Sequence, residues 1–289
     1  MTEPSTAAVT QRASTTRSVA GFTVTEWPGT GPTVLGLSGL GSHAPTWGPL
    51  AQSLPSTRFL GIDLRGRGAG QGMTGPTGLR QHARDVAAVV AELDLTDVVV
   101  VGHSMGAYLA PVVAQEAPGR IRHLVLVDGG ILPKFPFFMG PALTRMTFRK
   151  QLKSSDKEWP SVEELARKGR LDRMLQDRPD LTPVILGILE AELGGKPGAL
   201  RPRLDVSRAV EDAVDCFFGP DNAPALDALT VPAYVFLAEN AKKAGQRPFI
   251  SDAAVAPWTA RQPLLRVTRL PGNHMTVLFA PEVAEAVLA

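Results

Sequence analysis

The stretch that decides the fold is Val98-Val-Val-Val-Gly102-His-Ser-Met-Gly106, an apolar run that stops on a serine held between two glycines. Four β-branched residues in succession predict a strand that is buried on both faces. The residues after the serine, Gly106-Ala-Tyr-Leu-Ala110, suit the start of a helix. We therefore expect Ser104 on a sharp turn between a strand and a helix.

The spacing around this serine is that of a nucleophile elbow, G-x-S-x-G. Gly102 and Gly106 lie two residues before and after Ser104, where larger side chains would collide across the turn. Such a turn lifts the serine hydroxyl above the sheet. It also places the N–H of Met105 at a helix N-terminus, where an oxyanion is stabilised. The alternative is a serine in an ordinary strand-to-helix turn.

The composition is that of a globular protein without strong charge. A chain of 289 residues that is 44% hydrophobic can bury a large core, and a net charge of +2 gives no reason to expect nucleic acid or a membrane as partner. The single cysteine, Cys216, excludes an internal disulfide and agrees with a reducing compartment. The first 18 residues lack the apolar region of a secretory signal. We expect a cytoplasmic monomer or homodimer that acts on a small molecule.

Short apolar segments alternate with helical patterns on both sides of the elbow. A helix is expected over residues 77–93, where apolar side chains recur at helical spacing. The expected strands are residues 21–27, 33–37, 58–63, 98–102, 121–127, 231–237 and 264–270. Strands separated by helices predict an α/β fold with a doubly wound, mostly parallel sheet.

The alternation breaks between residues 131 and 228. Ser161 and Glu164 form a capping box, and Thr182-Pro183 begins a second helix that we expect to end at Gly194-Gly195. A third helix follows, and one face of it is lined by Val206, Val210, Val214 and Phe217. A long helical stretch without strands, inserted in an α/β alternation, predicts a cap over the sheet. The expected organisation is a disordered tail at 1–18, a core at 19–130 and 229–289, and a helical cap at 131–228.

A serine hydroxyl needs a general base, and the base needs a carboxylate to orient it. The chain has five histidines, and only His274 lies in a loop after the last expected strand. In this topology that loop opens on the same carboxyl edge of the sheet as the elbow, where ligands bind. The pattern therefore favours His274 as the base.

The chain resembles the α/β-hydrolase superfamily over nearly all of its length after the tail. The likeness is carried by Ser38-Gly-Leu-Gly41, Asp63-Leu-Arg-Gly-Arg-Gly68, Gly102-His-Ser-Met-Gly106, Leu124-Val-Leu-Val-Asp128 and Pro271-Gly-Asn-His274. The resemblance implies that Ser104 is the nucleophile, that His274 is the base, and that the N–H groups of Leu40 and Met105 form an oxyanion hole. It implies no cofactor for hydrolysis. The first glycine loop departs from the family pattern, because Ser38 stands where His is usual.

The carboxylate of the triad is left open by the sequence. The family's usual acid lies shortly past the strand that follows the cap, where this chain has Asn240-Ala-Lys-Lys-Ala-Gly245 and no carboxylate. Asp128, at the end of the strand after the elbow helix, is the first candidate. Glu239 is the alternative, and Asp252 is a third.

Aromatic residues near the elbow suggest a substrate wall. The segment Ile131-Leu-Pro-Lys-Phe-Pro-Phe-Phe-Met139 contains Phe135 and Phe138, and Trp47 follows the first glycine loop. These side chains, with Gly39 and His103, are the candidate substrate-binding residues, and core packing is the competing interpretation of the aromatic ones. An aromatic wall would imply a substrate with an apolar body.

Other enzyme classes fit the sequence less well. Gly70-Gln-Gly-Met-Thr-Gly75 matches G-x-G-x-x-G, the pattern of dinucleotide-binding enzymes. However, it begins several residues after its strand, and Glu92 lies within a helix instead of at the end of a second strand. A serine at the elbow argues against relatives that use an aspartate there, the dehalogenases and epoxide hydrolases. We expect a serine hydrolase that cleaves a carboxylic ester or lactone. The alternatives on the same fold are a carbon–carbon bond hydrolase, a perhydrolase and a non-catalytic ligand receptor.

Overall fold

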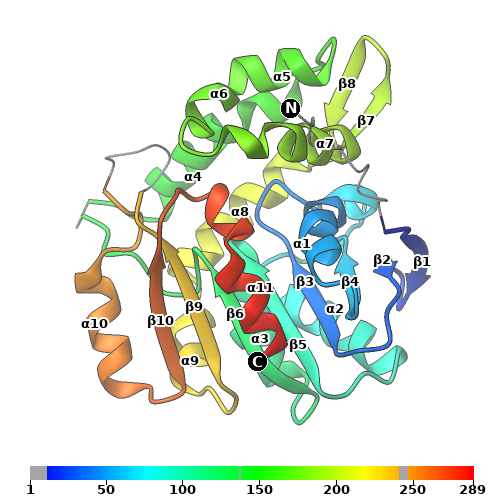
Figure 1. Ribbon diagram of the computed structural model, residues 1–289. Coiled ribbons are helices and arrows are strands. Elements are labelled where there is room, and N and C mark those ends of the chain that lie inside the picture. The colour runs from blue at the N-terminus through cyan, green and yellow to red at the C-terminus, as the bar shows by residue number, and fades with distance from the viewer. Residues whose placement is uncertain (1–11, 137, 241–246) are drawn as a thin grey trace, which may run out of the picture.

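The computed structural model describes residues 12–136, 138–240 and 247–289. Its centre is an eight-stranded sheet in the order β1-β2-β4-β3-β5-β6-β9-β10 (Figure 1). The strands are β1 (Thr15–Val19), β2 (Phe22–Trp27), β3 (Thr33–Leu37), β4 (Arg58–Ile62), β5 (Val98–His103), β6 (Ile121–Val127), β9 (Ala233–Ala238) and β10 (Leu265–Leu270). From β4 to β10 all neighbours are parallel, and β1 and β2 add an antiparallel edge. The predicted doubly wound, mostly parallel sheet is confirmed.

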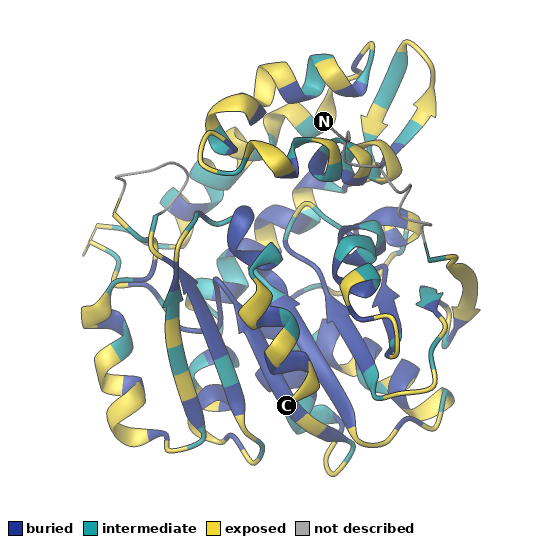
Figure 2. Cartoon of the chain, in the orientation of Figure 1, coloured by how far each residue is buried: buried dark blue, intermediate teal, exposed yellow. Residues whose placement is uncertain are grey.

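The middle of the sheet is covered on both faces. Val98 to Val101 on β5 are fully buried, which explains the run of β-branched residues (Figure 2). One face packs on α2 (Leu79–Glu92), α3 (Met105–Glu116), α9 (Asn222–Asp227) and α10 (Asp252–Arg261). The other packs on α1 (Gly48–Ser53) and α11 (Pro281–Leu288). Because β5 lies between β3 and β6 and is covered on both faces, the turn at its carboxyl end is held by neighbouring strands and helices.

Strand β1 corrects the end of the predicted disordered tail at 1–18, because residues 15–18 belong to the sheet. Thr15 to Val19 pair antiparallel with β2, from Thr15 opposite Glu26 to Val19 opposite Phe22. Only Val19 is buried, because β1 forms the edge of the sheet, so its sequence lacks the apolar alternation that marks a half-buried strand. Residues 1–11 lie outside the described residues.

Residues 131–228 form an insertion between β6 and β9. Its elements are α4 (Pro141–Gln151), α5 (Val162–Gly169), α6 (Leu171–Met174), α7 (Thr182–Glu192), β7 (Leu193–Lys196), β8 (Ala199–Pro202) and α8 (Val206–Phe218), followed by α9. Helices α5, α6 and α7 and the β7–β8 hairpin form a layer above the sheet (Figure 1). In this layer the outward faces of the helices are exposed, and the central strands below are buried (Figure 2).

The insertion differs from its prediction in one respect, because it contains strands. Helix α7 ends at Glu192, before Gly194-Gly195, and those glycines belong to the antiparallel β7–β8 hairpin. The left-handed φ values of Gly195 (+104°) and Gly198 (+87°) let the chain turn there, which glycine does without steric cost. The predicted N-cap of helix α5 at Ser161 is confirmed, because the Ser161 side chain accepts a hydrogen bond from the Glu164 amide at 3.2 Å.

Within the described ranges, no helix has both the length and the apolar character needed to cross a bilayer.

Candidate active site

Ser104 occupies a strained turn between β5 and α3. Its backbone has φ +56° and ψ −116°, a conformation that costs a non-glycine residue about 1–3 kcal/mol. A Cβ on Gly102 would collide with the carbonyl of Gly106, and a Cβ on Gly106 would collide with the carbonyl of Leu37. The two glycines therefore let the turn close tightly enough to present the serine side chain at the carboxyl edge of the sheet.

His274 lies between Ser104 and Asp128. Its Nε2 is 3.1 Å from the Ser104 hydroxyl, and its Nδ1 is 2.6 Å from Asp128 Oδ2. The other carboxylate oxygen of Asp128 accepts a hydrogen bond from the Ala238 amide at 3.0 Å. In the tautomer that satisfies this network, Nδ1–H donates to Asp128 and Nε2 accepts from the serine. This is the arrangement in which a histidine can take a proton from a serine hydroxyl.

The loop that carries His274 is held by the residues beside it. The side-chain oxygen of Asn273 accepts hydrogen bonds from the amides of Met275 and Thr276, at 3.0 and 3.2 Å. Its amide nitrogen donates to the carbonyl of Met174 in the insertion at 2.7 Å. The imidazole position is therefore tied to the insertion as well as to the sheet.

The other carboxylate candidates do not contact His274. Glu239 is exposed at the end of β9, and its backbone amide donates to the Leu270 carbonyl. Asp252 is at the start of α10, where its 89% exposed side chain pairs with Arg269 at 2.7 Å. Of the three carboxylates that the sequence left open, the structure brings only Asp128 to the imidazole.

Leu40 and Met105 border the cavity above Ser104. Met105 is the first residue of α3, so its N–H has no acceptor within the helix. Leu40 follows β3, the strand that neighbours β5. Their placement is compatible with the oxyanion hole that the resemblance implies.

Two cavities meet at the serine. The first has a volume of about 220 Å³, and its wall includes Met105, Tyr108, Phe148, Phe217 and Phe249. The second has a volume of about 340 Å³, and its wall includes Ile185, Ile188, Leu189, Leu278 and Phe279. Both cavities are bordered by Leu40, Ser104, Phe148, Gln151 and His274. The apolar lining is thus mainly aromatic in the first cavity and mainly aliphatic in the second.

Neither cavity has a lysine or an arginine among its described lining residues. In the first cavity, burial raises the pKa of Tyr108 and of Cys216 well above the usual range of each, so both stay protonated and neutral. In the second, burial raises the pKa of Glu192, which also accepts a hydrogen bond from the His43 amide at 3.1 Å. Neither space is built to hold an anionic group.

His103 and Gly39, two of the candidate substrate-binding residues, border the second cavity. Nε2 of His103 donates to the carbonyl of His274 at 2.8 Å, and the two rings lie 4.8 Å apart. Burial, and then the charge of His274, lower the pKa of His103 to about 4. A Cβ on Gly39 would lie 3.3 Å from that of Ser104. Gly39 therefore keeps the approach to the serine open, and His103 is a neutral support for the His274 loop.

The predicted aromatic wall is made of different residues. Trp47 is fully buried and packs on Phe59 with ring centres 5.8 Å apart, so it belongs to the core and borders neither cavity. Phe135 borders neither cavity and packs on two residues that do. Its ring centre lies 5.2 Å from that of Phe217 and 6.4 Å from that of Phe249. Phe138 is 63% exposed and borders neither cavity.

Sequence reasoning missed most of the side chains that do line the cavities. Phe148 and Gln151 come from α4, and Phe217 comes from α8, while Phe249 precedes α10. Phe217 was placed on one face of a helix, but periodicity does not distinguish a face that packs on the core from one that borders a cavity. The part of the insertion that turns toward the serine is decided by packing between distant segments.

The comparisons with known proteins agree with this fold. The model of the alpha/beta hydrolase family matches residues 34–286. A 2-(acetamidomethylene)succinate hydrolase of Mesorhizobium japonicum is 27% identical over 260 residues, which are 88% of this chain and 86% of that protein.

Solved structures show the same architecture. The crystal structure of E-2-(acetamidomethylene)succinate hydrolase has a TM-score of 0.76 at 21% identity, over 95% of this chain and 98% of that one. The thioesterase domain from the curacin biosynthetic pathway has a TM-score of 0.69 at 20% identity, over 96% of this chain and 99% of that one. At such identities the likeness shows the fold alone. Because the family model spans nearly all of the sheet and the insertion, the chain belongs to the alpha/beta hydrolase family.

Proposed function

We propose that this protein is a serine hydrolase that cleaves an uncharged carboxylic ester with an apolar body, through an acyl-enzyme on Ser104. One observation carries the proposal: His274 lies within hydrogen-bond distance of both Ser104, at 3.1 Å, and Asp128, at 2.6 Å, where two apolar cavities meet. A nucleophile, a base and an orienting carboxylate in this order are what acyl transfer requires.

The reaction follows from the positions of these groups. Ser104 Oγ attacks the ester carbonyl as its proton passes to Nε2 of His274, and the charge on His274 is balanced by Asp128. The amides of Leu40 and Met105 donate to the developing oxyanion. The carbon–oxygen bond to the alcohol then breaks, and the alcohol leaves with the proton from His274. Water, activated by the same histidine, attacks the acyl-enzyme and releases the acid.

In this proposal the insertion at 131–228 serves as the cap. Helices α4 and α8 contribute Phe148 and Phe217 to the first cavity, and α7 contributes Ile188 to the second. Apolar walls on both sides of the serine exclude water and strengthen the electrostatic interactions at the reacting carbonyl.

The cavities also suggest which ester fits. Two spaces that meet at one serine suit a linear ester, whose acyl and alcohol parts extend in opposite directions from the carbonyl carbon. A lactone joins these parts in one ring, so it would use the pair of cavities less fully. The lack of lysine and arginine among the described lining residues argues against a carboxylate-bearing substrate such as the succinate in the relative's name.

Labelling with a fluorophosphonate probe tests the mechanism. We expect a stoichiometric adduct on Ser104 by mass spectrometry in the folded protein and none in Ser104→Ala. Absence of the adduct from the folded wild type would overturn the hydrolase proposal and favour a ligand-binding role.

A matched pair of esters tests the substrate class. p-Nitrophenyl butyrate and p-nitrophenyl hemisuccinate share a leaving group and differ in the charge on the acyl part. We expect at least tenfold higher kcat/KM for the butyrate, and faster turnover of the linear ester than of a lactone with the same number of carbons. A preference for the hemisuccinate would overturn the assignment of an uncharged substrate.

A further inference from the structure

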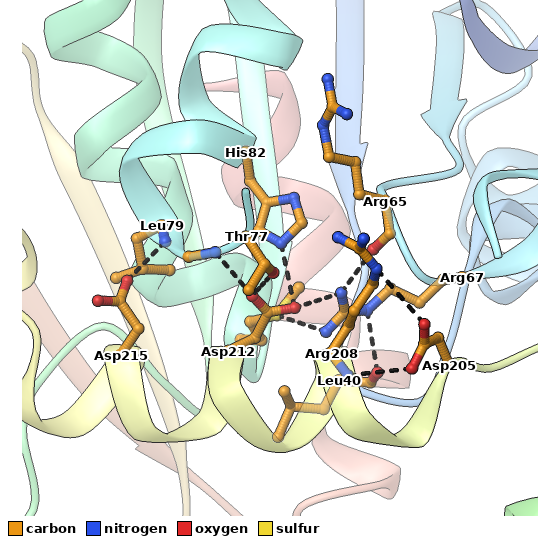
Figure 3. A network of polar contacts seen from close by, with 12 residues as sticks. Leu40, Arg65, Arg67, Thr77, Leu79, His82, Asp205, Arg208, Asp212 and Asp215 are labelled. Atoms are coloured by element: carbon orange, nitrogen blue, oxygen red, sulfur yellow. Dashed lines mark hydrogen bonds and ion pairs between the residues drawn. The ribbon is translucent and has the colours of Figure 1, made fainter. Parts of the chain in front are cut away.

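Arg67 is a fully buried arginine beside the proposed oxyanion hole. Its Nε donates to the carbonyl of Leu40 at 3.0 Å (Figure 3). Its Nη2 lies 3.2 Å from the sulfur of Met105. These are the two residues whose amides the proposed mechanism uses. One guanidinium thus contacts the residue on each side of the proposed anion site without reaching the reacting atoms itself.

The charge of Arg67 is balanced by Asp212, which comes from helix α8 of the insertion. Arg67 Nη1 donates to Asp212 Oδ2 at 2.5 Å, and both side chains are only 1% exposed. Asp212 also accepts a hydrogen bond from the Thr77 hydroxyl, and His82 Nε2 lies 3.1 Å away (Figure 3). The Gly78 amide donates to the same carboxylate at 2.8 Å. The insertion therefore reaches Leu40 and Met105 through one buried ion pair.

The pair stays ionised at neutral pH. Burial opposes ionisation of Asp212, but the charge of Arg67 and the nearby His82 outweigh it, so the pKa of Asp212 lies far below its usual range. A buried ion pair is a weak source of stability compared with apolar packing of the same volume, because both charges lose their hydration. Its directional hydrogen bonds, in contrast, fix the positions of the groups that they join.

We propose that Arg67 and Asp212 are positioning residues, through which helix α8 of the insertion sets the geometry of the oxyanion hole. The inference rests on the proposed function, because it concerns the amides of Leu40 and Met105. If it holds, the docking of the insertion and the assembly of the catalytic site are coupled. A correctly seated α8 then both closes the first cavity, through Phe217, and holds the anion donors in place.

The competing interpretation is that Asp212 only fastens α8 to the core. The same helix offers a matched control in Asp215, whose Oδ2 accepts a hydrogen bond from the Leu79 amide at 2.6 Å (Figure 3). Asp215 is one turn further along α8 and contacts the same helix α2, and the structure records no contact of its side chain with Leu40, Met105 or Arg67. Asp212→Asn and Asp215→Asn therefore make the same chemical change at two contacts between α8 and the core. Only the contact of Asp212 is connected, through Arg67, to Leu40 and Met105.

The experiment compares wild type, Asp212→Asn, Asp215→Asn and Arg67→Lys. For each we would measure thermal stability, kcat and KM for p-nitrophenyl butyrate, and the second-order rate of fluorophosphonate labelling. Lysine keeps a positive charge near Asp212 but has no planar fork that reaches the Leu40 carbonyl and the Met105 sulfur together. It supplies a second test if Asp212→Asn does not fold.

We expect kcat and the labelling rate to fall at least tenfold in Asp212→Asn and in Arg67→Lys, with KM within twofold of wild type. Asp215→Asn should keep kcat within twofold even where its melting temperature falls. Equal losses of kcat in the two asparagine variants, or wild-type kcat in folded Arg67→Lys, would overturn the positioning role. Failure of the hydrolase proposal is distinguishable, since wild type itself would then form no Ser104 adduct.

Discussion

Nδ1 of His274 lies 2.6 Å from Oδ2 of Asp128, although the two residues are 146 positions apart in the chain. Asp128 follows β6 and His274 follows β10, and one strand, β9, separates these two in the sheet. The contact forms because parallel strands end at the same edge of the sheet. The carboxylate that meets the imidazole therefore comes from the strand after the elbow helix, and Glu239, at the end of the intervening β9, remains exposed.

Replacement of Asp128 by Asn should lower kcat by about 10³–10⁴ with little change in KM, because the imidazole loses its orienting anion and favours the wrong tautomer. Glu239→Gln is the matched control and should retain wild-type kcat. Steady-state kinetics on p-nitrophenyl butyrate measure both. Loss of activity in Glu239→Gln together with an active Asp128→Asn would reverse the assignment of the acid.

Replacement of Gly106 by Ala should destabilise the protein by about 3 kcal/mol or more, because the new Cβ would collide with the backbone carbonyl of Leu37. Gly72→Ala is the control, since a Cβ there meets no atom within 4 Å. Urea unfolding of the two variants measures the difference. Equal midpoints for Gly106→Ala and wild type would show that the turn accommodates a side chain.

Acid should destabilise the protein through His103. Burial and the neighbouring His274 lower the pKa of His103 from 6.5 to about 4, so the unfolded state binds the proton more readily. The stabilisation is complete above about pH 6.5 and is lost as the pH falls toward 4. The full shift corresponds to about 3 kcal/mol, and partial exposure of the side chain reduces this to about 1–2 kcal/mol.

His103→Gln tests this assignment, because glutamine keeps a donor for the carbonyl of His274 but does not titrate. Urea unfolding between pH 4.5 and 7.5 should give a shallower dependence of the unfolding free energy on pH in the variant than in wild type. Parallel pH profiles would locate the acid sensitivity elsewhere.

The two cavities should control different halves of the substrate. Phe217→Ala enlarges the aromatic cavity and Ile188→Ala enlarges the aliphatic one, and neither residue borders both. Each variant should raise kcat/KM for longer chains on one side of the ester only, by about tenfold per well-fitted pair of methylene groups. Two ester series measure this, one that varies the acyl chain and one that varies the alcohol chain. A shift of the same series by both variants would contradict separate acyl and alcohol sites.

Some features of this protein follow from residues that are near one another in the chain. The β-branched run before Gly102 requires a buried strand, and the spacing of Gly102, Ser104 and Gly106 requires a tight turn, because each depends on steric contacts over a few residues. The alternation of apolar segments with helical patterns likewise indicated the parallel sheet. The position of His274 after the last strand followed from that topology.

Other features depend on contacts between distant segments, which local patterns do not encode. The choice of Asp128 over Glu239, the burial of Trp47 in the core, and the pairing of β1 at the sheet edge were each decided by packing. The same is true of Phe148 and Phe217, which α4 and α8 turn toward the serine. The sequence by itself determined the strand, the turn and the position of Ser104 on it, since these rest on local sterics. The tertiary structure alone decided which carboxylate, which walls and which buried ion pair surround it, since those depend on how elements far apart in the chain come together.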